Sequence, residues 1–303
     1  MPPDLLVLAD DLTGALEVGA KLGERVGFSL PASIIDTETR HVAPSEAQAK
    51  IEGILFQARP GRVYKKTDST LRGNIAAELA ALATAYPNEP IHYIPAYPKM
   101  GRTVKSQRLY VHGVFAGEIG DMPNVVVHDG ETDGDVAAAV RCAGRVICGP
   151  ASIADHLAPP IAPAQLPEIR TCLVVNGSRQ DVSAGQIAEA VSHGWQIVEP
   201  ADVESALVTS GWLILRVDHA RASAAMICEI AKRANVDAVA VFGGDTAYAI
   251  VRALGDETIA PIAEVVPGVV LSRLTGMYLI TKAGGFGAPD VLRSVKNAVA
   301  QVS

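Results

Sequence analysis

Short apolar runs, rich in β-branched residues, recur along the chain and are separated by alanine-rich stretches. A run of four or five apolar residues is too short for a helix and is typical of a buried strand. Alternation of such strands with helical stretches predicts α/β layers around a mostly parallel sheet. In the first half, we expect strands at 5–9, 63–64, 91–94, 125–127 and 146–148, and helices at 75–85 and 135–142.

The second half repeats the pattern, with strands expected at 171–175, 212–215, 238–242 and 277–280. Ser183 is a candidate N-cap for a helix that reaches about His193. A helix over 246–254 would end at Gly255, because glycine is the usual residue just past a helix. Pro289 is expected to begin a last helix that reaches about Ala300.

A proline-rich stretch divides the two halves. Four of the 19 prolines stand at positions 159, 160, 163 and 167. Proline cannot donate to a strand ladder, and it restricts the residue before it. We therefore predict a linker at 159–169 between domains 1–158 and 170–303, each a mostly parallel sheet flanked by helices. Ligands bind beyond the carboxyl ends of such strands, so the residues just after each strand are the ones that matter most for a binding site.

Composition excludes several classes of protein. The 303 residues are 49% hydrophobic and 19% charged, which argues against a disordered chain. A net charge of −7 and only 5% aromatic residues argue against a nucleic-acid binder or a protein of anionic membrane surfaces.

Location and redox state follow from local features. The start, Met1 to Asp4, lacks the basic region of a signal peptide, and no apolar run approaches a membrane span, so a cytoplasmic location is expected. The cysteines form no C-x-x-C pair, which predicts neither a zinc knuckle nor a disulfide framework. We interpret them as packing residues in a reducing compartment: Cys142, Cys148, Cys172 and Cys228.

In the first half, polar residues follow three of the expected strands. Asp10 and Asp11 come directly after the first one. They could cap the following helix, or hydrogen-bond a polyol and accept a hydroxyl proton. Residues 65–74 then gather Lys, Asp, Ser, Thr and Arg in one turn, which fits either an anionic polyol or a solvated loop with a capping Asp.

Residues 95–108 carry four basic residues and no acidic one, inside an acidic protein. A basic surface stripe and an anion site both fit this stretch. Taken with the two preceding turns, it predicts a pocket for a small, acidic, hydroxylated molecule.

Glycine-rich turns follow strands of the second half instead, at 176–178, 243–247 and 282–287. Glycine lets backbone N–H groups approach phosphate closely, and a helix N-terminus completes an anion site. The sequence has neither a P-loop motif nor a G-x-G-x-x-G fingerprint, so it supports neither a P-loop NTPase nor a standard Rossmann dehydrogenase. Glu264, ahead of Pro267-Gly268, either borders a nucleotide or is a charge at a strand end.

These motifs, in this order, resemble the four-carbon acid sugar kinase family, whose members phosphorylate acids such as threonate, erythronate and 3-oxo-tetronate with ATP. The resemblance spans nearly the whole chain. Its motifs are 9–15, 66–74, 95–98 with 101–104, 177–178, 243–247, 267–268 and 281–287.

The resemblance implies a substrate domain followed by a nucleotide domain, with the active site in the interdomain cleft. The residues that would bind the sugar acid are Asp10, Asp11, Lys66, Asp68, Ser69, Arg72, Gly101 and Arg102. Those that would bind ATP are Ser178, Gly243, Gly244, Asp245, Thr246, Lys282, Gly284 and Gly285.

Phosphoryl transfer depends on positioning and charge stabilisation. Mg²⁺ would bridge phosphate oxygens and take one carboxylate at most, with Asp245 as a candidate. Asp10, Asp11 and Asp245 compete for the role of general base. Arg72 and Arg102 would pair with the substrate carboxylate or with the transferred phosphoryl group.

The chain is shorter than usual members of this family, and the shortage falls after Val114, on the substrate side. A second hypothesis is therefore a non-catalytic sensor of sugar acid and nucleotide. A nucleotide-dependent oxidoreductase is a third reading, against which the missing fingerprint argues. The expected ligands are ATP, Mg²⁺ and a small sugar acid, without nucleic acid or membrane; a homo-oligomer is left open.

Overall fold

The computed structural model describes residues 4–300 and divides the chain into two compact units, 1–161 and 162–303. Each unit is an α/β structure with a mostly parallel sheet flanked by helices, in agreement with the predicted fold class. Residues 158–171, which carry the proline cluster, form neither helix nor strand. None of the helices within residues 4–300 is long and apolar enough to cross a bilayer.

Seven parallel strands form the sheet of the first unit. In spatial order they are β2 (Val26–Gly27), β3 (Ile34–Asp36), β1 (Leu5–Ala9), β4 (Arg62–Lys66), β10 (Val146–Gly149), β5 (Ile91–Tyr93) and β9 (Val125–Val127). From β1, the chain moves to β3 on one side and then crosses to β4 on the other. The connections therefore diverge between β1 and β4, and in open α/β sheets ligands bind beyond the carboxyl ends of such a pair.

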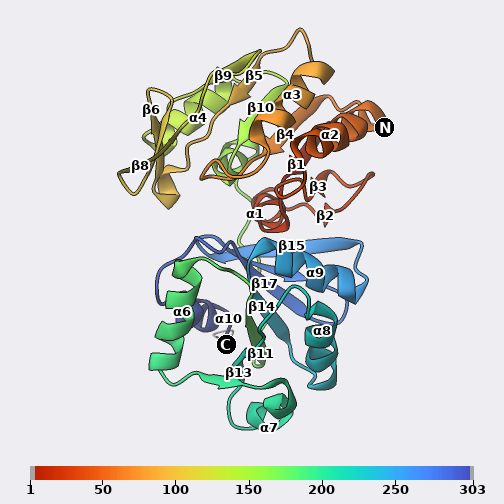
Figure 1. Ribbon diagram of the computed structural model, residues 1–303, viewed down its shortest axis with the longest axis vertical. Helices are drawn as coiled ribbons and strands as arrows, with labels where there is room; N and C mark the ends of the chain where they lie inside the picture. Colours follow the sequence, from red (N-terminus) through yellow and green to blue (C-terminus); the bar gives the residue numbers. More distant parts are fainter. Residues whose placement is uncertain (1–3, 301–303) are drawn as a thin grey trace. The chain divides into compact units, whose positions relative to one another are not determined.

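Helices cover both faces of this sheet. They are α1 (Leu12–Leu22), α2 (Pro44–Ala58), α3 (Ile75–Ala85), α4 (Asp133–Cys142) and α5 (Ala154–Leu157). Right-handed crossovers in opposite directions put helices on opposite faces. Accordingly, α2 packs beside α3 (Figure 1), whereas α1 and α4 both contact α5.

A small antiparallel sheet is inserted between β5 and β9. Its strands are β6 (Arg102–Lys105), β7 (Arg108–Val111) and β8 (Val114–Glu118), and a short 3-10 turn at Pro98–Met100 leads into it. The sequence analysis did not predict these strands: residues 95–108 were interpreted only as a basic stretch, and residues 109–118 were assigned no element.

The second unit has its own seven-stranded sheet. The order is β12 (Gln196–Val198), β13 (Trp212–Leu215), β11 (Cys172–Asn176), β14 (Ala238–Phe242), β17 (Tyr278–Lys282), β16 (Val269–Arg273) and β15 (Thr258–Val266). The first five strands are parallel, and the last two pair antiparallel. The connections diverge between β11 and β14, which repeats the layout of β1 and β4.

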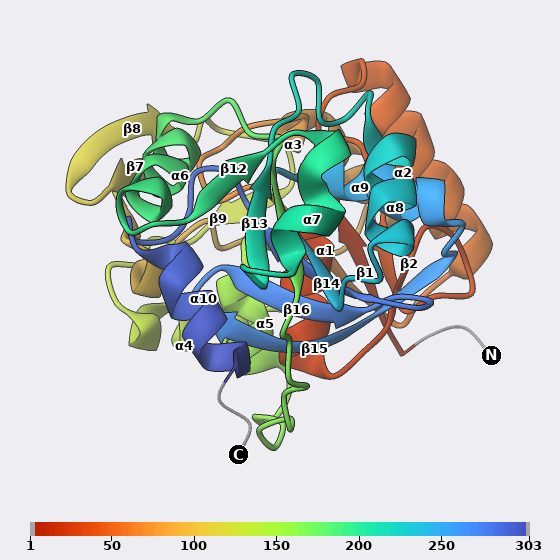
Figure 2. The same ribbon diagram turned by 90° about the horizontal axis from the view of Figure 1, so that it is seen from below.

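The helices of this unit are α6 (Asp181–Ser192), α7 (Val203–Leu207), α8 (Ala224–Arg233), α9 (Gly244–Leu254) and α10 (Val291–Ala300). Helix α8 packs beside α9, and α10 packs against α6 and β15 (Figures 1 and 2). The buried faces of α10 and of the strands form one apolar core around Val174, Trp212 and Leu271.

Most of the named segments match, with corrections at the ends of elements. The N-cap assigned to Ser183 was wrong: α6 begins at Asp181 after Gln180, and Ser183 is a buried residue of its first turn. Helix α4 begins at Asp133 because Thr132 and Asp135 form a capping box. Helix α9 begins two residues earlier than expected, at Gly244, and ends as expected at Gly255, which has a φ of 82°.

The remaining corrections concern the last two elements. The final strand begins at Tyr278 and runs on to Lys282. The final helix begins at Val291, so Pro289 precedes it rather than starting it.

Candidate functional site

The predicted polar residues of the first unit lie at the carboxyl ends of β1 and β4. Asp11 is the N-cap of α1 and accepts a hydrogen bond from the Gly14 N–H at 3.0 Å. Its other oxygen accepts from the Thr13 hydroxyl at 2.6 Å. Asp10 is 1% exposed and does not cap the helix. The sequence left open whether these aspartates cap the helix or act on a substrate. Asp11 caps the helix, whereas Asp10 does not.

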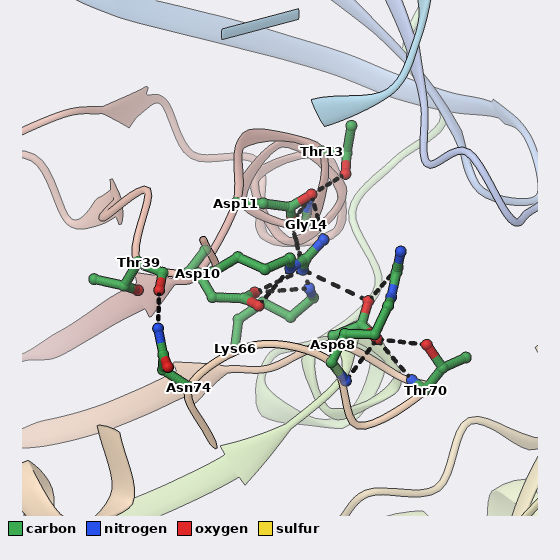
Figure 3. Close-up of polar contacts among 12 residues, drawn as sticks. Asp10, Asp11, Thr13, Gly14, Thr39, Lys66, Asp68, Thr70 and Asn74 are labelled. Atoms are coloured by element: carbon green, nitrogen blue, oxygen red, sulfur yellow. Dashed lines mark hydrogen bonds and ion pairs between the residues drawn. The ribbon is translucent and has the colours of Figure 1, made fainter. Parts of the chain in front are cut away.

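Arg40 links the two carboxylates, and the sequence analysis missed it. Its Nε and Nη2 donate to the two oxygens of Asp10 at 2.7 and 2.9 Å. Its Nη1 lies 2.8 Å from Asp11 Oδ2, and its Nη2 lies 3.7 Å from Asp68 Oδ1. One buried guanidinium thus joins three carboxylates from two strand ends. Figure 3 labels these carboxylates, which belong to Asp10, Asp11 and Asp68.

The loop that carries Arg40 follows β3 and is held by hydrogen bonds. The Thr37 hydroxyl donates to the Ala9 carbonyl at 2.6 Å, and the Arg40 N–H donates to the Asp10 carbonyl at 3.2 Å. Asn74 Nδ2 donates to the carbonyls of Thr39 and Val42 at 2.7 and 2.9 Å. A signal for this loop existed, because Ile34-Ile35 is a short apolar run whose carboxyl end would lie beside that of β1.

Lys66 comes from the end of β4 and is 5% exposed. Its Nζ lies 3.8 Å from Asp10 Oδ1 and 4.0 Å from Asp11 Oδ1. A Cβ on Gly14 would lie 2.1 Å from that Nζ, so only glycine at position 14 leaves room for the lysine. Burial would raise the pKa of Asp10, but Arg40, Lys66 and Lys65 outweigh it and hold that pKa below its ordinary value.

Asp68 and Arg72 form the outer part of the cluster. Arg72 Nε and Nη2 donate to the two Asp68 oxygens at 3.0 and 2.6 Å. Against the effect of burial, the Arg72 hydrogen bonds and the charge of Arg40 hold the pKa of Asp68 well below its usual range. Arg72 is 45% exposed, so the rest of its guanidinium faces outward.

One hydroxyl in the same loop lacks a partner. Ser69 Oγ is buried and forms no hydrogen bond within the described residues, whereas the Thr67 hydroxyl interacts with that of the buried Tyr93. Burial lowers the pKa of Arg102, although the charge of Asp68 acts in the opposite direction. Gly101 precedes it with a φ of 75° and ends the 3-10 turn. The structure thus gathers Asp10, Asp11, Lys66, Asp68, Ser69 and Arg72, with Arg102 near enough for their charges to act on it.

The glycine-rich turns of the second unit pack against one another at the ends of β11, β14 and β17. A Cβ on Gly177 would lie 2.0 Å from Thr246 Oγ1, and one on Gly284 would lie 2.1 Å from Ser178 Oγ. A Cβ on Gly243, which has a φ of 113°, would lie 3.3 Å from the carbonyl carbon of Gly177. Glycine at these positions is therefore what allows the turns to meet.

The first turn of α9 opens on these loops. Gly243 is its N-cap, and no side chain caps it. The N–H groups of a helix's first turn have no partner within the helix, so they can bind an anion. Asp245 lies in this turn with its carboxylate 42% exposed, 3.7 Å from Arg221 Nη1.

A cavity of about 720 Å³ adjoins the turn after β11. It is lined by residues 176–179, 218–222 and Ala249. The wall at 218–222 was missed, although the strand before it, β13, was predicted. Glu264 lies within β15 and accepts a hydrogen bond from the Gly268 N–H at 2.6 Å, so it holds a turn between strands.

Comparison with known proteins gives each half a description. Residues 5–120 match the model of a sugar-binding N-terminal domain, and residues 215–292 match that of a nucleotide-binding C-terminal domain. A D-threonate kinase of Bordetella bronchiseptica is 27% identical over 396 aligned positions, which cover 98% of both chains. A D-erythronate kinase of Heliobacterium modesticaldum is 30% identical over 132 residues, or 37% of this chain and 30% of that one.

Two solved structures share the fold. A protein of Salmonella typhimurium LT2 has a TM-score of 0.75 at 16% identity and covers 97% of this chain and 98% of its own. A DUF1537 protein of Haemophilus influenzae has a TM-score of 0.69 at 16% identity, with coverage of 97% and 99%. With matched domain models in both halves and a full-length resemblance to a sugar-acid kinase, the chain belongs to the four-carbon acid sugar kinase family.

Proposed function

We propose that this protein transfers the terminal phosphoryl group of ATP to a hydroxyl of a four-carbon sugar acid such as threonate, erythronate or 3-oxo-tetronate. The observation that carries the proposal is the same layout in both units. In each, polar loops follow the two adjacent strands between which the connections diverge. One unit offers charged and hydroxyl groups there, and the other offers glycine turns and a helix N-terminus.

The first unit supplies groups that suit an acid with several hydroxyls. Ser69 has a buried hydroxyl without a partner, and a substrate hydroxyl would satisfy it. Arg72 uses Nε and one N–H of Nη2 for Asp68, which leaves its Nη1 and one further N–H for a substrate carboxylate. Asp10 and Asp11 add acceptors for hydroxyl protons.

The second unit supplies groups that suit a nucleoside triphosphate. The uncapped first turn of α9 and the loop at Gly284, which packs against Ser178, would present backbone N–H groups to the phosphates. The cavity beside residues 176–179 has the volume of a small-molecule site and would take the nucleoside.

Magnesium would depend mainly on the phosphates. No group of three His, Cys, Asp or Glu side chains that could hold a metal is found within residues 4–300. Magnesium commonly keeps several waters and takes one or two carboxylates together with substrate phosphates, a need that Asp245 on α9 could meet. When bound, the ion would neutralise charge on the phosphate oxygens.

The acceptance of the substrate proton falls to a carboxylate of the first unit. Asp10 and Asp11 both remain candidates, because both are held in place by Arg40 beside Lys66. Their fixed geometry would orient the hydroxyl, and the surrounding cations would stabilise charge that develops during transfer.

The test measures ADP release with a coupled assay, in which the protein and Mg-ATP are combined with each of a panel of four-carbon sugar acids. We expect release that depends on the acid, with saturation in both substrates. A specific alternative is a sensor, because the alignment with the Bordetella kinase spans 396 positions and this chain has 303 residues. The sensor would be favoured, and the kinase rejected, if both ligands bind and raise the melting temperature but no acid in the panel leads to ADP release.

A further inference from the structure

Lys282, the last residue of β17, has a fully buried side chain and forms no ion pair with a carboxylate among the described residues. Its Nζ lies 4.4 Å from the centre of the Phe242 ring. It donates to the carbonyls of Ala283 at 2.9 Å, Phe286 at 3.0 Å and Gly284 at 3.2 Å. These three carbonyls belong to residues 283–288, here called the glycine loop, and a fourth acceptor is the Ser183 hydroxyl of α6 at 3.3 Å.

Helix α6 supplies further donors to the same loop. Gln186 Nε2 donates to the carbonyls of Phe286, Gly287 and Ala288, each at 3.0 Å. The Ser183 hydroxyl donates to the Gly284 carbonyl at 2.8 Å. Five of the six carbonyls of the glycine loop therefore point inward, onto side chains of α6 and β17.

Inward carbonyls fix where the N–H groups point. In a planar trans peptide, the N–H of one residue is antiparallel to the carbonyl of the residue before it. The N–H groups of Gly284, Gly285, Gly287 and Ala288 are thus directed away from Lys282. Successive N–H groups on one side of a turn form a concave site for anions.

Resting on the proposed role of this unit in nucleotide binding, we propose that Lys282 is a positioning residue. It contacts no phosphate itself, but holds the carbonyls of the glycine loop inward so that the N–H groups are presented to the phosphates. This role differs from the direct contact with the nucleotide expected from the sequence.

The inference has a pH signature. Burial lowers the pKa of Lys282 to about 7. The groups that face it are Ser183 and Gln186 from α6, Phe242 from β14 and the loop carbonyls, and none of them titrates in this range. The ammonium has three N–H donors for four acceptors, namely the three carbonyls and the Ser183 hydroxyl, whereas the neutral amine has only two.

An anion bound on the other side of the loop favours the charged ammonium and raises the pKa of Lys282. Binding therefore takes up a proton, and affinity falls as pH rises through the pKa of the free protein. A rise of one pKa unit on binding corresponds to about a tenfold loss of affinity at high pH.

The experiment is calorimetric titration with ADP from pH 6.5 to 9, on the full chain and three variants. Lys282→Met removes the ammonium. Gln186→Leu removes the amide that donates to the other loop carbonyls and leaves the Lys282 ammonium in place. Lys232→Met removes an exposed lysine of α8 as the matched control. The nucleotide's own titration is the same in every variant and cancels in the comparison.

We expect the wild type and Lys232→Met to lose affinity above pH 7 and to take up a proton on binding. Lys282→Met should bind ADP about 10- to 100-fold more weakly at pH 6.5, and its affinity should lack the pH dependence that the wild type and the other two variants share. Gln186→Leu should bind more weakly and keep that dependence.

A folded Lys282→Met with wild-type affinity would overturn the inference, and so would a wild-type affinity that follows only the nucleotide's titration. If Lys282→Met does not fold, the pH dependence of ADP affinity in the wild type and in Gln186→Leu decides whether the inference holds. A wild type that has the expected pH dependence and proton uptake but phosphorylates no sugar acid contradicts the kinase proposal alone. A wild type that binds no ADP contradicts both.

Discussion

At the scale of single residues, Arg40 determines the chemistry of the first unit. Its guanidinium donates hydrogen bonds to Asp10 and Asp11 together, at shorter distances than those from Lys66 Nζ, and both carboxylates are nearly fully buried. Charges that are buried this deeply stay ionised only where an opposite charge and hydrogen bonds replace water. The candidate bases of the proposed reaction thus depend on a residue from a different strand end.

Replacement of Arg40 by alanine should destabilise the protein by about 3–5 kcal/mol, because it leaves two buried carboxylates without their main partner. Urea unfolding at pH 7 measures the loss. The control is Arg216→Ala, whose side chain is 58% exposed in its pair with Glu199 and should cost about 0.5 kcal/mol or less. Equal losses in the two variants would contradict the account.

Acid titration tests the paired carboxylates. The pKa values of Asp10 and Asp68 are lowered in the folded protein, so the unfolded chain takes up their protons first. Their stabilising contribution is complete above the unfolded pKa of about 4 and is lost as pH falls toward the folded values. Urea midpoints between pH 2.5 and 6 should therefore fall with acid, less steeply in Asp68→Asn. An unchanged slope in that variant would reject the pairing.

At the scale of elements, the ends of strands were the most informative part of the sequence. The rule that polar residues after parallel strands meet at one edge brought Asp10, Lys66 and Asp68 together correctly. It missed Arg40 because β3 is only three residues long, and a strand of that length leaves almost no pattern. The hydrogen bonds that select which side chain pairs with which, such as Asn74 to the Thr39 carbonyl, depend on backbone geometry that periodicity does not encode.

Gly14 tests the contact between α1 and β4. Alanine there would place its Cβ 2.1 Å from Lys66 Nζ and displace the lysine from the two carboxylates. We expect the KM for the sugar acid to rise about tenfold, as for the loss of a charged hydrogen-bonding group. Gly53→Ala is the control, because its Cβ in α2 meets nothing within 4 Å and should stabilise the protein by about 0.5–1 kcal/mol. A wild-type KM in Gly14→Ala would contradict the positioning of Lys66.

Gly177 tests the meeting of the turns in the second unit. A Cβ there would lie 2.0 Å from the hydroxyl of Thr246, which is only 2% exposed and has little room to move. Displacing the start of α9 should weaken ADP binding by at least about tenfold in calorimetry. Gly185→Ala, on the open side of α6, should leave binding unchanged. Similar affinities for the two variants would argue against phosphate binding at this helix end.

At the scale of the whole molecule, the two units share one layout, in which polar or glycine-rich loops follow the two strands where the connections diverge, but the loops differ in chemistry. The sequence was sufficient for the α/β class and the sugar-binding and nucleotide-binding halves, because strand ends and motifs are local features. It was insufficient for substrate identity, since features such as the partnerless hydroxyl of Ser69 arise from packing. The chain is also much shorter than the 396-position alignment with its Bordetella relative.

The most direct test of the kinase proposal is phosphorus NMR of the reaction mixture. The wild-type protein, Mg-ATP and each of threonate, erythronate and 3-oxo-tetronate are incubated separately. For at least one acid, the account predicts a new phosphate monoester resonance that grows as ATP is converted to ADP. Unchanged ATP with every acid, or release of inorganic phosphate alone, would contradict it.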